Sequence, residues 1–446
     1  MRLGFLAMSG VRAHEPELTA LGLTLPGFVE RNKVVASLPS LGLLTLAGAT
    51  RTGVEVEYVD VPDVLPTPWL PGEFDAVAVS SFSAQIKEAY ELADRYRAAG
   101  TKVILGGLHV TALPHEAAMH ADAIVLGEGE PLWPRVVDDL LQDTLDPVYD
   151  ARHVKFDLAE GPMPRYEMLD VEKYNRLTIQ TQRGCPFDCE FCAASIRIAP
   201  GFKVKPVSSV IRELRRIKTL WPQPFIEFAD DNTFANKAHG RRLLTALAGE
   251  HVRWFTETDV SIAADAELLS LMRDSGCAQV LIGFEAPTRA PLEHVERTNW
   301  KARQFDRYRE AIDTIQSYGI SVNGCFILGL DGAGPESFDE VLRFVRDSGL
   351  YEVQITVQTA FPGTPLYERL RGEGRILRDA AWELCTLFDV NFQPAHMSVA
   401  QLEQGLRDLA RQLYDADATN ERQGRFRNRL RTIRRLKGEN DEQRLA

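Results

Sequence analysis

Short apolar runs alternate with amphipathic helical patterns over the first third of the chain. From Ala84 to Ala99, apolar residues recur at helical spacing, which predicts a helix with one buried face. This repetition of strand and helix is typical of a parallel sheet covered by helices on both faces. We therefore predict a doubly wound, Rossmann-like α/β domain over residues 1–142. Its strands are expected at Arg2–Met8, Val54–Val61, Ala76–Phe82, Lys102–Leu105 and Ala123–Leu126.

Residues 143–176 lack such a pattern and contain several prolines, which indicates a linker. From residue 177 to residue 362 the strand and helix pattern returns six times. Each repeat is about long enough for a right-handed βαβ crossover, so this segment predicts a partial (β/α)6 TIM-like barrel. The expected strands are Leu177–Gln180, Phe225–Ala229, Val252–Thr256, Gln279–Phe284, Ser321–Leu328 and Glu352–Thr359. The expected helices between them include Val207–Leu220, Ala263–Asp274, Ala302–Tyr318 and Ser337–Asp347.

Residues 363–446 predict a helical C-terminal extension around an extended piece at Leu387–Pro394. Its last thirty residues are rich in arginine, and we expect an exposed helix or a frayed tail there. Contact with RNA is a minor alternative for this tail. The basic residues are Arg425, Arg427, Arg429, Arg431, Arg434, Arg435 and Lys437.

Composition narrows the class of protein. The chain has 446 residues, of which 45% are hydrophobic, so several domains can each bury a core. A net charge of −12 disfavours nucleic acid as a general partner. The apolar N-terminus leads into a polar stretch with no cleavage site, so we interpret it as a first strand and not as a signal peptide. No apolar run reaches the length of a membrane span, and we therefore expect a soluble, cytoplasmic protein.

Three of the six cysteines lie within eight residues, directly after the first expected barrel strand. Cys185, Cys189 and Cys192 favour a metal site in a reducing compartment over a disulfide framework. Zinc sites are normally closed by four protein ligands, whereas an iron–sulfur cluster bound by three cysteines keeps one iron open. Two alternatives are a redox pair formed by Cys189 and Cys192, and a zinc site that these cysteines share with other ligands.

The CxxxCxxC spacing, with Phe191 before the last cysteine, resembles the signature of the radical S-adenosylmethionine (SAM) enzymes. The resemblance implies a 4Fe–4S cluster whose open iron binds SAM, and reductive cleavage of SAM to a 5′-deoxyadenosyl radical. It further implies that Phe191 lies near the adenine. It also implies a reducing partner such as flavodoxin or ferredoxin, and a small-molecule substrate.

Later strand ends carry further family-like residues for SAM. Asp230 and Asp231, in a DDNxF stretch, are expected to receive the SAM ammonium group, although a helix N-cap is the plainer use of such residues. Gly283 and Glu285, in a GxE segment, are expected beside the sugar or amine of SAM. Asn323 is expected at the ribose or carboxylate.

The N-terminal domain resembles the cobalamin-binding domain of one radical SAM subfamily, in which GGxH and GEGE loops recur at the strand ends. Glycines let backbone approach a bulky ligand, and hydroxyls can bond it. The DxHxxG motif that supplies a cobalt ligand is absent from the sequence, so cobalamin is expected to bind without a protein imidazole. The alternative is a domain that has lost the cofactor and acts as a lid. The expected cobalamin-binding residues are Ser80, Ser81, Ser83, Gly106, Gly107, His109, Gly127 and Glu128.

The resemblance implies C-methylation of a small metabolite as the leading function. The alternative is radical dehydration of an aminosugar diol with a vestigial cobalamin domain, as in aminoglycoside biosynthesis. The remaining cysteines, Cys277, Cys325 and Cys385, are expected to be buried hydrophobic residues. His396 is expected at the surface.

Overall fold

The computed structural model describes residues 1–8, 14–20, 38–62, 64, 69–194, 197–199, 201–293 and 295–436. The chain divides into two compact units. The first unit comprises Met1–His14, Val35–Asp231 and Thr359–Phe392, and the second comprises Glu15–Val34, Asn232–Gln358 and Gln393–Ala446. These units are groups of residues that pack together in space, whereas the four segments expected from the sequence are consecutive stretches of the chain. The units therefore do not test the expected segment boundaries, which stay a prediction.

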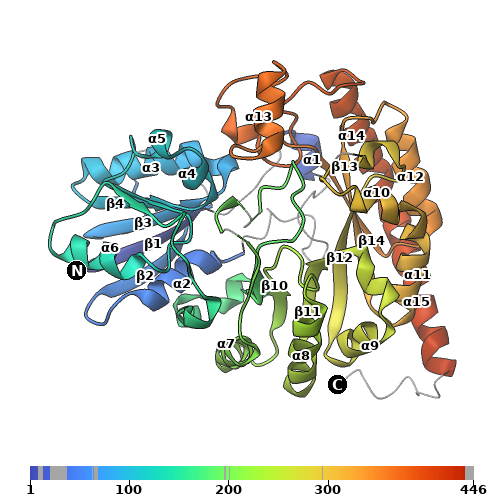
Figure 1. Cartoon of the computed structure of the whole chain (residues 1–446), viewed down its shortest axis with the longest axis horizontal. Helices are drawn as coiled ribbons and strands as arrows, with labels where there is room; N and C mark the ends of the chain where they lie inside the picture. Colours follow the sequence, from blue (N-terminus) through green and yellow to red (C-terminus); the bar gives the residue numbers. More distant parts are fainter. Residues whose placement is uncertain are drawn as a thin grey trace. The chain divides into compact units, whose positions relative to one another are not determined.

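A six-stranded parallel sheet lies at the start of the first unit (Figure 1). Its order, β2-β1-β3-β4-β5-β6, reverses between β1 and β3. Ligands of such sheets bind beyond the strand carboxyl ends at this switch point. Strand β6 lies in the expected linker, since three residues are too few to show periodicity. The strands are β1 Arg2–Met8, β2 Glu55–Asp60, β3 Ala76–Ser81, β4 Lys102–Gly106, β5 Ala123–Leu126 and β6 Val148–Asp150.

Helices cover both faces of this N-terminal sheet, as predicted. On one face, α2 (Leu41–Ala49) and α6 (Trp133–Leu141) pack on alternate strand residues, and the Phe5 and Trp133 rings lie 5.7 Å apart. The other face carries α3 (Ile86–Ala98), α4 (Leu108–Ala112) and α5 (Pro114–Ala117) (Figure 1). The 3-10 helix η1 (Ser83–Gln85) precedes α3. The buried helix residues follow the helical period that the sequence shows.

The expected barrel strands fall into two groups. In the first unit β7 (Leu177–Ile179) pairs in parallel with β10 (Phe225–Phe228), and α7 (Val207–Leu220) precedes β10. In the second unit four strands form the parallel order β14-β13-β12-β11. These are β11 Arg253–Thr258, β12 Cys277–Glu285, β13 Ser321–Leu328 and β14 Glu352–Val357.

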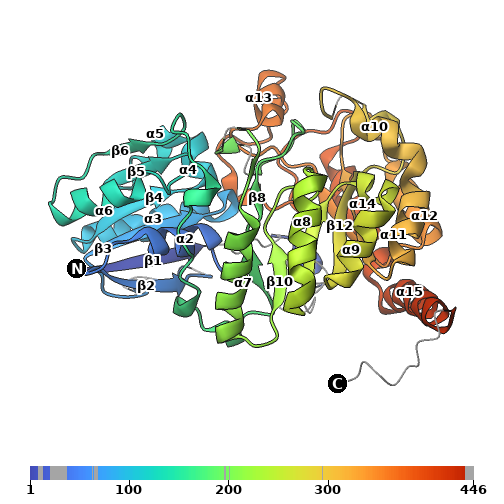
Figure 2. The ribbon, with the colours of Figure 1, turned by 60° about the horizontal axis from the view of Figure 1, so that its bottom comes forward.

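Helices of the second unit cover the outside of the four strands (Figure 2). They are α8 Lys237–Leu247, α9 Ala266–Asp274, α10 Trp300–Gln304, α11 Tyr308–Ser317 and α12 Ser337–Ser348. A single helix was expected over Ala302–Tyr318, but the 3-10 helix η9 (Phe305–Arg307) separates α10 from α11. A 3-10 turn keeps nearly the same spacing of apolar residues, so the sequence pattern does not reveal it.

The expected C-terminal extension contributes to both units. Helix α13 (Pro365–Gly372) and the 3-10 helix η10 (Trp382–Leu384) belong to the first, and α14 (Val399–Tyr414) and α15 (Ala416–Leu436) to the second. A capping box of Ser398 and Gln401 starts α14. Most of the expected basic tail is helical in α15, while Lys437 lies outside the described residues. No described helix is both long and apolar enough to span a membrane.

Candidate functional site

The three clustered cysteines lie between Gly184 and Phe202, a segment of which the structure describes residues 184–194, 197–199, 201 and 202. We call this segment the cysteine loop. A short antiparallel hairpin of β8 (Gln182–Arg183) and β9 (Lys203–Val204) closes it. Gly184, at φ +88°, lies at the neck, and a Cβ there would come within 2.2 Å of the Gly201 carbonyl oxygen. Only glycine fits this close approach. The hairpin was not predicted, because two-residue strands give no periodic signal.

Arg197 holds the turn that carries two of the cysteines. Its guanidinium donates to the carbonyl oxygens of Cys189 (2.9 Å) and Cys192 (2.7 Å), and the Cys192 amide donates to the Cys189 carbonyl (3.1 Å). Cys185, Cys189 and Cys192 form no disulfide, and the half-buried Phe191 lies in the same turn. Three thiols on one closed loop fit the donor set of a cluster with one open iron.

Among the described residues, no group of three or more histidine, cysteine, aspartate or glutamate side chains lies close enough together to hold a single metal ion. Ligands of a 4Fe–4S cluster bind separate irons, so their sulfur atoms need not converge in this way.

An ion pair holds the middle of the cysteine loop. Glu190, between two of the cysteines, accepts a bidentate pair of bonds from Arg369 on α13, at 2.6 and 3.0 Å. The Leu366 amide donates to the Glu190 carbonyl oxygen at 3.0 Å. Paired guanidinium and carboxylate groups fix orientation as well as distance. The C-terminal extension therefore helps to shape the cysteine loop, a role that the sequence did not reveal.

Glu128 was expected at cobalamin, but its carboxylate is occupied by ion pairs. Oε1 accepts from Arg183 at 2.7 Å, and Oε2 accepts from Lys203. Glu130 also accepts from Arg183, at 2.7 Å. Burial opposes the positive charge of Arg183, yet Glu130 and Glu128 outweigh it and raise the pKa of the guanidinium. The side chain of Glu128 therefore serves the cysteine-loop hairpin in this structure.

Asp230, expected at the SAM ammonium group, holds the end of the first barrel strand. Its Oδ1 accepts from the amides of Thr181 (2.7 Å) and Gln182 (3.0 Å), and its Oδ2 accepts from the Thr181 hydroxyl (2.5 Å). These bonds fix the backbone that leads into β8. The neighbouring Asp231 is more exposed than Asp230, which is 4% exposed. Of the two carboxylates, Asp231 is therefore the better placed for a ligand.

Gly283 and Glu285 lie together at the end of β12. A bulge separates them, and Glu285 adopts φ +63°, the left-handed region that costs energy for any residue except glycine. The Lys301 ammonium donates to the Glu285 carboxylate (2.6 Å) and to the Gly283 carbonyl oxygen (3.2 Å). A Cβ at Gly283 would lie 2.5 Å from Glu285 Oε1. Strained backbone of this kind often marks a functional site, and the carboxylate of Glu285 lies at a strand end where a ligand could reach it. Lys301 is the partner of this carboxylate that sequence reasoning missed.

Asn323 is a buried polar residue on β13 of the second unit. It is 1% exposed, and neither its amide nitrogen nor its oxygen has a hydrogen-bond partner among the described residues. Strand pairing places Asn323 and Cys325 on one face of β13, and Cys325 lies opposite Gly283 and Gln354. The Gln354 side-chain oxygen is also buried without a partner. Buried polar groups are rarely left unbonded, so this face fits a polar ligand such as SAM.

The expected cobalamin residues lie at the carboxyl ends of β3, β4 and β5. Gly107 has φ +108°, and a Cβ there would approach Ser80 Oγ to 3.3 Å. Gly127, at φ +78°, has no room for a Cβ because the Arg152 amide lies 2.9 Å away. Thr111 ties the two loops together, since its hydroxyl donates to the Gly107 carbonyl (2.8 Å) and accepts from the Gly127 amide (3.0 Å). The backbone conformation and the close packing at these two positions therefore require glycine.

Beside these loops, the β3 end offers hydroxyls and an exposed aromatic ring. Ser80 and Ser81 are half-buried, and the Ser81 hydroxyl donates to the Phe82 carbonyl oxygen at 2.8 Å. Phe82 is 48% exposed although it is large and apolar. Together with the half-buried Gly106, this edge fits the flat, partly apolar face of a corrin ring.

His109 does not offer a nitrogen to a metal. It is 1% exposed, its Nδ1 lies 3.0 Å from Ser83 Oγ, and its Nε2 lies 3.3 Å from Glu116 Oε1. Trp382 donates to the other Glu116 oxygen at 3.0 Å. Burial raises the pKa of Glu116, but bonds from His109 and Trp382 outweigh it and lower that pKa. Glu116, which bonds both Trp382 and His109, thus joins η10 of the C-terminal extension to the N-terminal domain, and the rings of His109 and Trp382 lie 5.4 Å apart.

Cys277 and Cys385 are buried as expected, whereas Cys325, also expected to be buried, is only half-buried. Burial raises the pKa of Cys277 and of Cys325 far above the usual range. Burial also raises the pKa of Cys385 to about 12, and the Asn391 amide donates to its sulfur at 3.7 Å. The Asn391 side chain also bonds the backbone of Ala360. Its oxygen accepts from the Ala360 amide (3.0 Å), and its nitrogen donates to the Ala360 carbonyl oxygen (3.1 Å).

We therefore expect Cys385 to resist alkylation in the folded protein. At pH 8 a thiol with a pKa near 12 is roughly 1000-fold less ionised than an ordinary thiol, and the thiolate is the nucleophile. Peptide mapping after iodoacetamide treatment measures the rate, with the urea-unfolded protein as the reference. Equal labelling of Cys385 in the folded and unfolded protein would contradict this environment.

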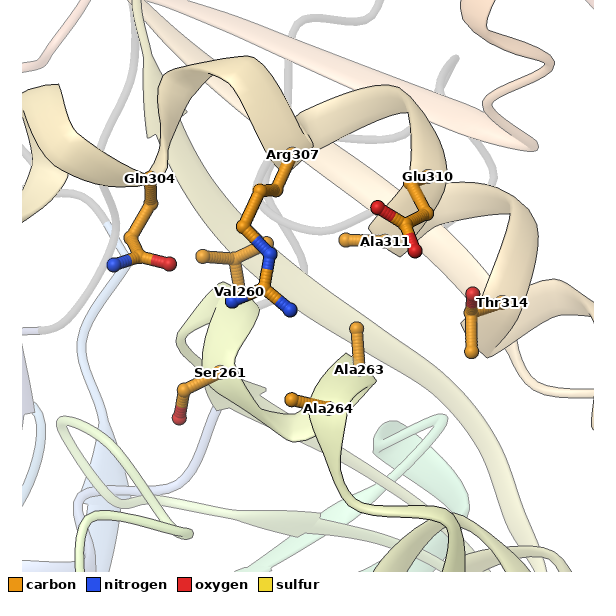
Figure 3. Close-up of a pocket in the computed structure, with 9 residues that line it drawn as sticks. All are labelled: Val260, Ser261, Ala263, Ala264, Gln304, Arg307, Glu310, Ala311 and Thr314. Carbon is orange, nitrogen blue, oxygen red and sulfur yellow. The ribbon is translucent and has the colours of Figure 1, made fainter.

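A shallow pocket of about 300 Å³ lies on the outside of the second unit between η7 (Val260–Ala264) and the α10–α11 segment. Figure 3 shows the Arg307 side chain reaching across it above Val260. Small side chains and exposed charges line it, and none of the expected site residues does. Its lining residues are Val260, Ser261, Ala263, Ala264, Gln304, Arg307, Glu310, Ala311 and Thr314.

Family models match three parts of the chain. The radical SAM superfamily model matches residues 179–345, the B12 binding domain model matches residues 30–137, and a domain of unknown function (DUF4070) matches residues 364–445. The first match includes the cysteine loop, and the second includes the strand ends with Gly107 and Gly127.

Two curated proteins are similar to this chain over most of its length. Bacteriochlorophyllide d C-12(1)-methyltransferase of Chlorobaculum tepidum is 26% identical, covering 86% of this chain and 84% of that protein. Hopanoid C-2 methylase of Rhodopseudomonas palustris is 29% identical, covering 78% and 67%. Among solved structures, the radical SAM methyltransferase TsrM of Kitasatospora setae, with cobalamin and a [4Fe-4S] cluster bound, is 16% identical with a TM-score of 0.64, covering 92% of this chain and 85% of TsrM. These matches confirm the predicted fold class.

Proposed function

We propose the reaction from the premise that this chain belongs to the radical SAM enzymes with a cobalamin-binding domain. Its cofactors are a 4Fe–4S cluster, SAM and cobalamin. The proposed reaction is methylation of a carbon atom in a small-molecule substrate. The observation that carries this proposal is that the segments matched by the two family models are bonded to each other. Arg183 and Lys203, at the two ends of the cysteine loop, both donate to Glu128 in the loop after β5, and all three residues lie in one compact unit.

The proposed assignments follow the contacts of each residue. Cys185, Cys189 and Cys192 would bind three irons of the cluster, and Arg197 would hold their loop closed. The loops around Gly107 and Gly127 would receive cobalamin through backbone. With both nitrogens of His109 bonded, these loops supply no imidazole to cobalt.

On the second unit, Glu285 and Asn323 would bind the polar groups of SAM. Lys301 fixes the Glu285 carboxylate. On binding SAM, the buried side-chain amide of Asn323 would gain the hydrogen bonds that it lacks among the described residues. When bound, these cofactors would supply one-electron cleavage of SAM, which yields methionine and, after a hydrogen atom is taken from the substrate carbon, 5′-deoxyadenosine; they would also supply the methyl group that this carbon receives. The electron requires an external reductant, for which a flavodoxin or ferredoxin is the proposed class of partner.

The relatives support methylation over the alternative reaction. Both similar curated proteins carry methylase names, and each aligns over more than two thirds of this chain. No described contact favours dehydration of a sugar diol. The substrates named for those relatives are a chlorophyll-type pigment and a hopanoid, and we propose only the shared reaction class for this chain.

Product analysis tests the reaction class. Anaerobic enzyme loaded with cluster and cobalamin is reduced with SAM and candidate substrates, and both nucleosides are quantified. C-methylation should consume two SAM per product and yield S-adenosylhomocysteine together with 5′-deoxyadenosine. Substrate turnover with deoxyadenosine alone, in protein that retains cobalamin, would instead establish a dehydratase-type reaction.

A further inference from the structure

Both ends of the cysteine loop are bonded to a single carboxylate. In the β8–β9 hairpin Arg183 lies directly opposite Lys203, and like charges in such a cross-strand pair repel. Glu128 relieves this repulsion by accepting from Arg183 at Oε1 and from Lys203 at Oε2. The hairpin that closes the cysteine loop therefore depends on an anion that comes from outside it.

This arrangement is buried and nearly charge-balanced. The Glu128 side chain is 1% exposed, and those of Arg183 and Lys203 are 13% and 18% exposed. Glu130 adds a second carboxylate on Arg183. Breaking a buried ion pair by removing one partner is strongly destabilising, because it leaves an uncompensated charge. We call the set of Glu128, Glu130, Arg183 and Lys203 the loop anchor.

The anchor joins segments with different expected cofactors. Glu128 directly follows the positive-φ residue Gly127, at the cobalamin edge of the N-terminal sheet. Arg183 and Lys203 flank the loop that carries the three cysteines. All of these residues lie in the first compact unit. A shift of the hairpin away from Glu128 would therefore move the cysteine loop relative to the strand ends of the sheet.

We propose that Glu128 is a positioning residue, which fixes the cysteine loop against the cobalamin edge so that SAM cleavage stays coupled to methyl transfer. The proposal rests on the function proposed above. It gives the GEGE loop a role that differs from binding the cofactor with its side chain. If the cysteine loop is displaced, SAM is still cleaved, but the radical is quenched or abstracts hydrogen without a methyl transfer to follow. The loss of Glu128 is therefore expected to raise the amount of SAM cleaved per methylated product.

The test compares Glu128→Gln with Asp265→Asn in enzyme loaded with cluster and cobalamin. Asp265 is the matched control, since its carboxylate also pairs with an arginine and a lysine, Arg241 at 2.7 Å and Lys237 at 3.9 Å, but lies in the second unit. In Glu128→Gln, deoxyadenosine formed per methylated product should rise several-fold, and hydrogen exchange should quicken in residues 184–202. Iron and corrin contents should stay at wild-type levels. Asp265→Asn should change neither the ratio nor the exchange of this loop.

Unchanged loop exchange in a folded Glu128→Gln variant would overturn the proposal. Loss of corrin with an unchanged loop would overturn it as well and assign Glu128 to the cofactor. If Glu128→Gln does not fold, Lys203→Gln is the second variant, because it removes only the bond between Lys203 and Glu128. It should raise the deoxyadenosine ratio and the loop exchange by a smaller amount. Unchanged values in Lys203→Gln would also contradict the proposal. An unaltered enzyme that makes no methylated product would disprove the proposed function, while the exchange measurement would still decide the anchor.

Discussion

Replacing Cys189 with alanine is expected to abolish SAM cleavage, with a loss of activity of at least roughly 1000-fold. Three thiolates are the protein ligands that a cluster with an open iron needs, and Cys189 begins the turn that Arg197 holds. The unaltered protein, purified without oxygen, should be brown and contain about four irons per chain. Iron and sulfide analysis together with 5′-deoxyadenosine production measures the effect.

Cys277→Ala is the matched control for this experiment. Cys277 is buried at the start of β12 in the second unit, where burial raises the pKa of its thiol, and we expect its replacement to leave iron content at the wild-type level. Stoichiometric zinc without iron in the unaltered protein, or undiminished SAM cleavage in Cys189→Ala, would favour a zinc or redox-sensing protein instead.

Replacing Asn323 with leucine is expected to change stability and SAM binding in opposite directions. An unbonded buried amide costs about 1–3 kcal/mol, so leucine should raise the thermal unfolding midpoint of the protein without SAM. SAM affinity should fall by roughly 10- to 100-fold, because each hydrogen bond to a charged ligand contributes about 1.5–3 kcal/mol. Scanning fluorimetry without SAM and equilibrium binding of SAM measure the two effects.

Asn391→Leu provides the contrasting control. Asn391 is also buried, but its amide bonds both polar atoms of the Ala360 backbone. The same substitution should therefore lower the unfolding midpoint at this position. A lower midpoint in Asn323→Leu, or unchanged SAM affinity, would show that Asn323 has a structural role and no ligand.

The regular elements could be predicted from the sequence because they depend on local patterns. β13 and α7 have the predicted bounds, and most other strands differ by one or two residues at their ends. Their long apolar periods make the strand and helix repeat visible. The β8–β9 hairpin and β6 were missed, since strands of two or three residues owe their pairing to tertiary contacts.

Motif spacing also located the loops that matter. The three cysteines, the Gly107 and Gly127 loops and the strand end at Glu285 all lie where glycine conformation or a short ligand spacing leaves a local signature. The roles expected of these residues in binding cofactors stay predictions, apart from what their contacts show.

The sequence by itself thus determined the α/β repetition, the clustered thiols and the glycine-rich strand ends, because each depends on neighbouring residues. Only the tertiary structure decided how the side chains are partnered. It pairs Glu128 with Arg183 and Lys203, 55 and 75 residues away, and Glu190 with Arg369, 179 residues away. It also leaves the buried Asn323 side chain without a hydrogen-bond partner in the part of the chain that the structure describes. A buried charge or amide must be satisfied by whatever the fold brings beside it, and that neighbour cannot be deduced from local sequence.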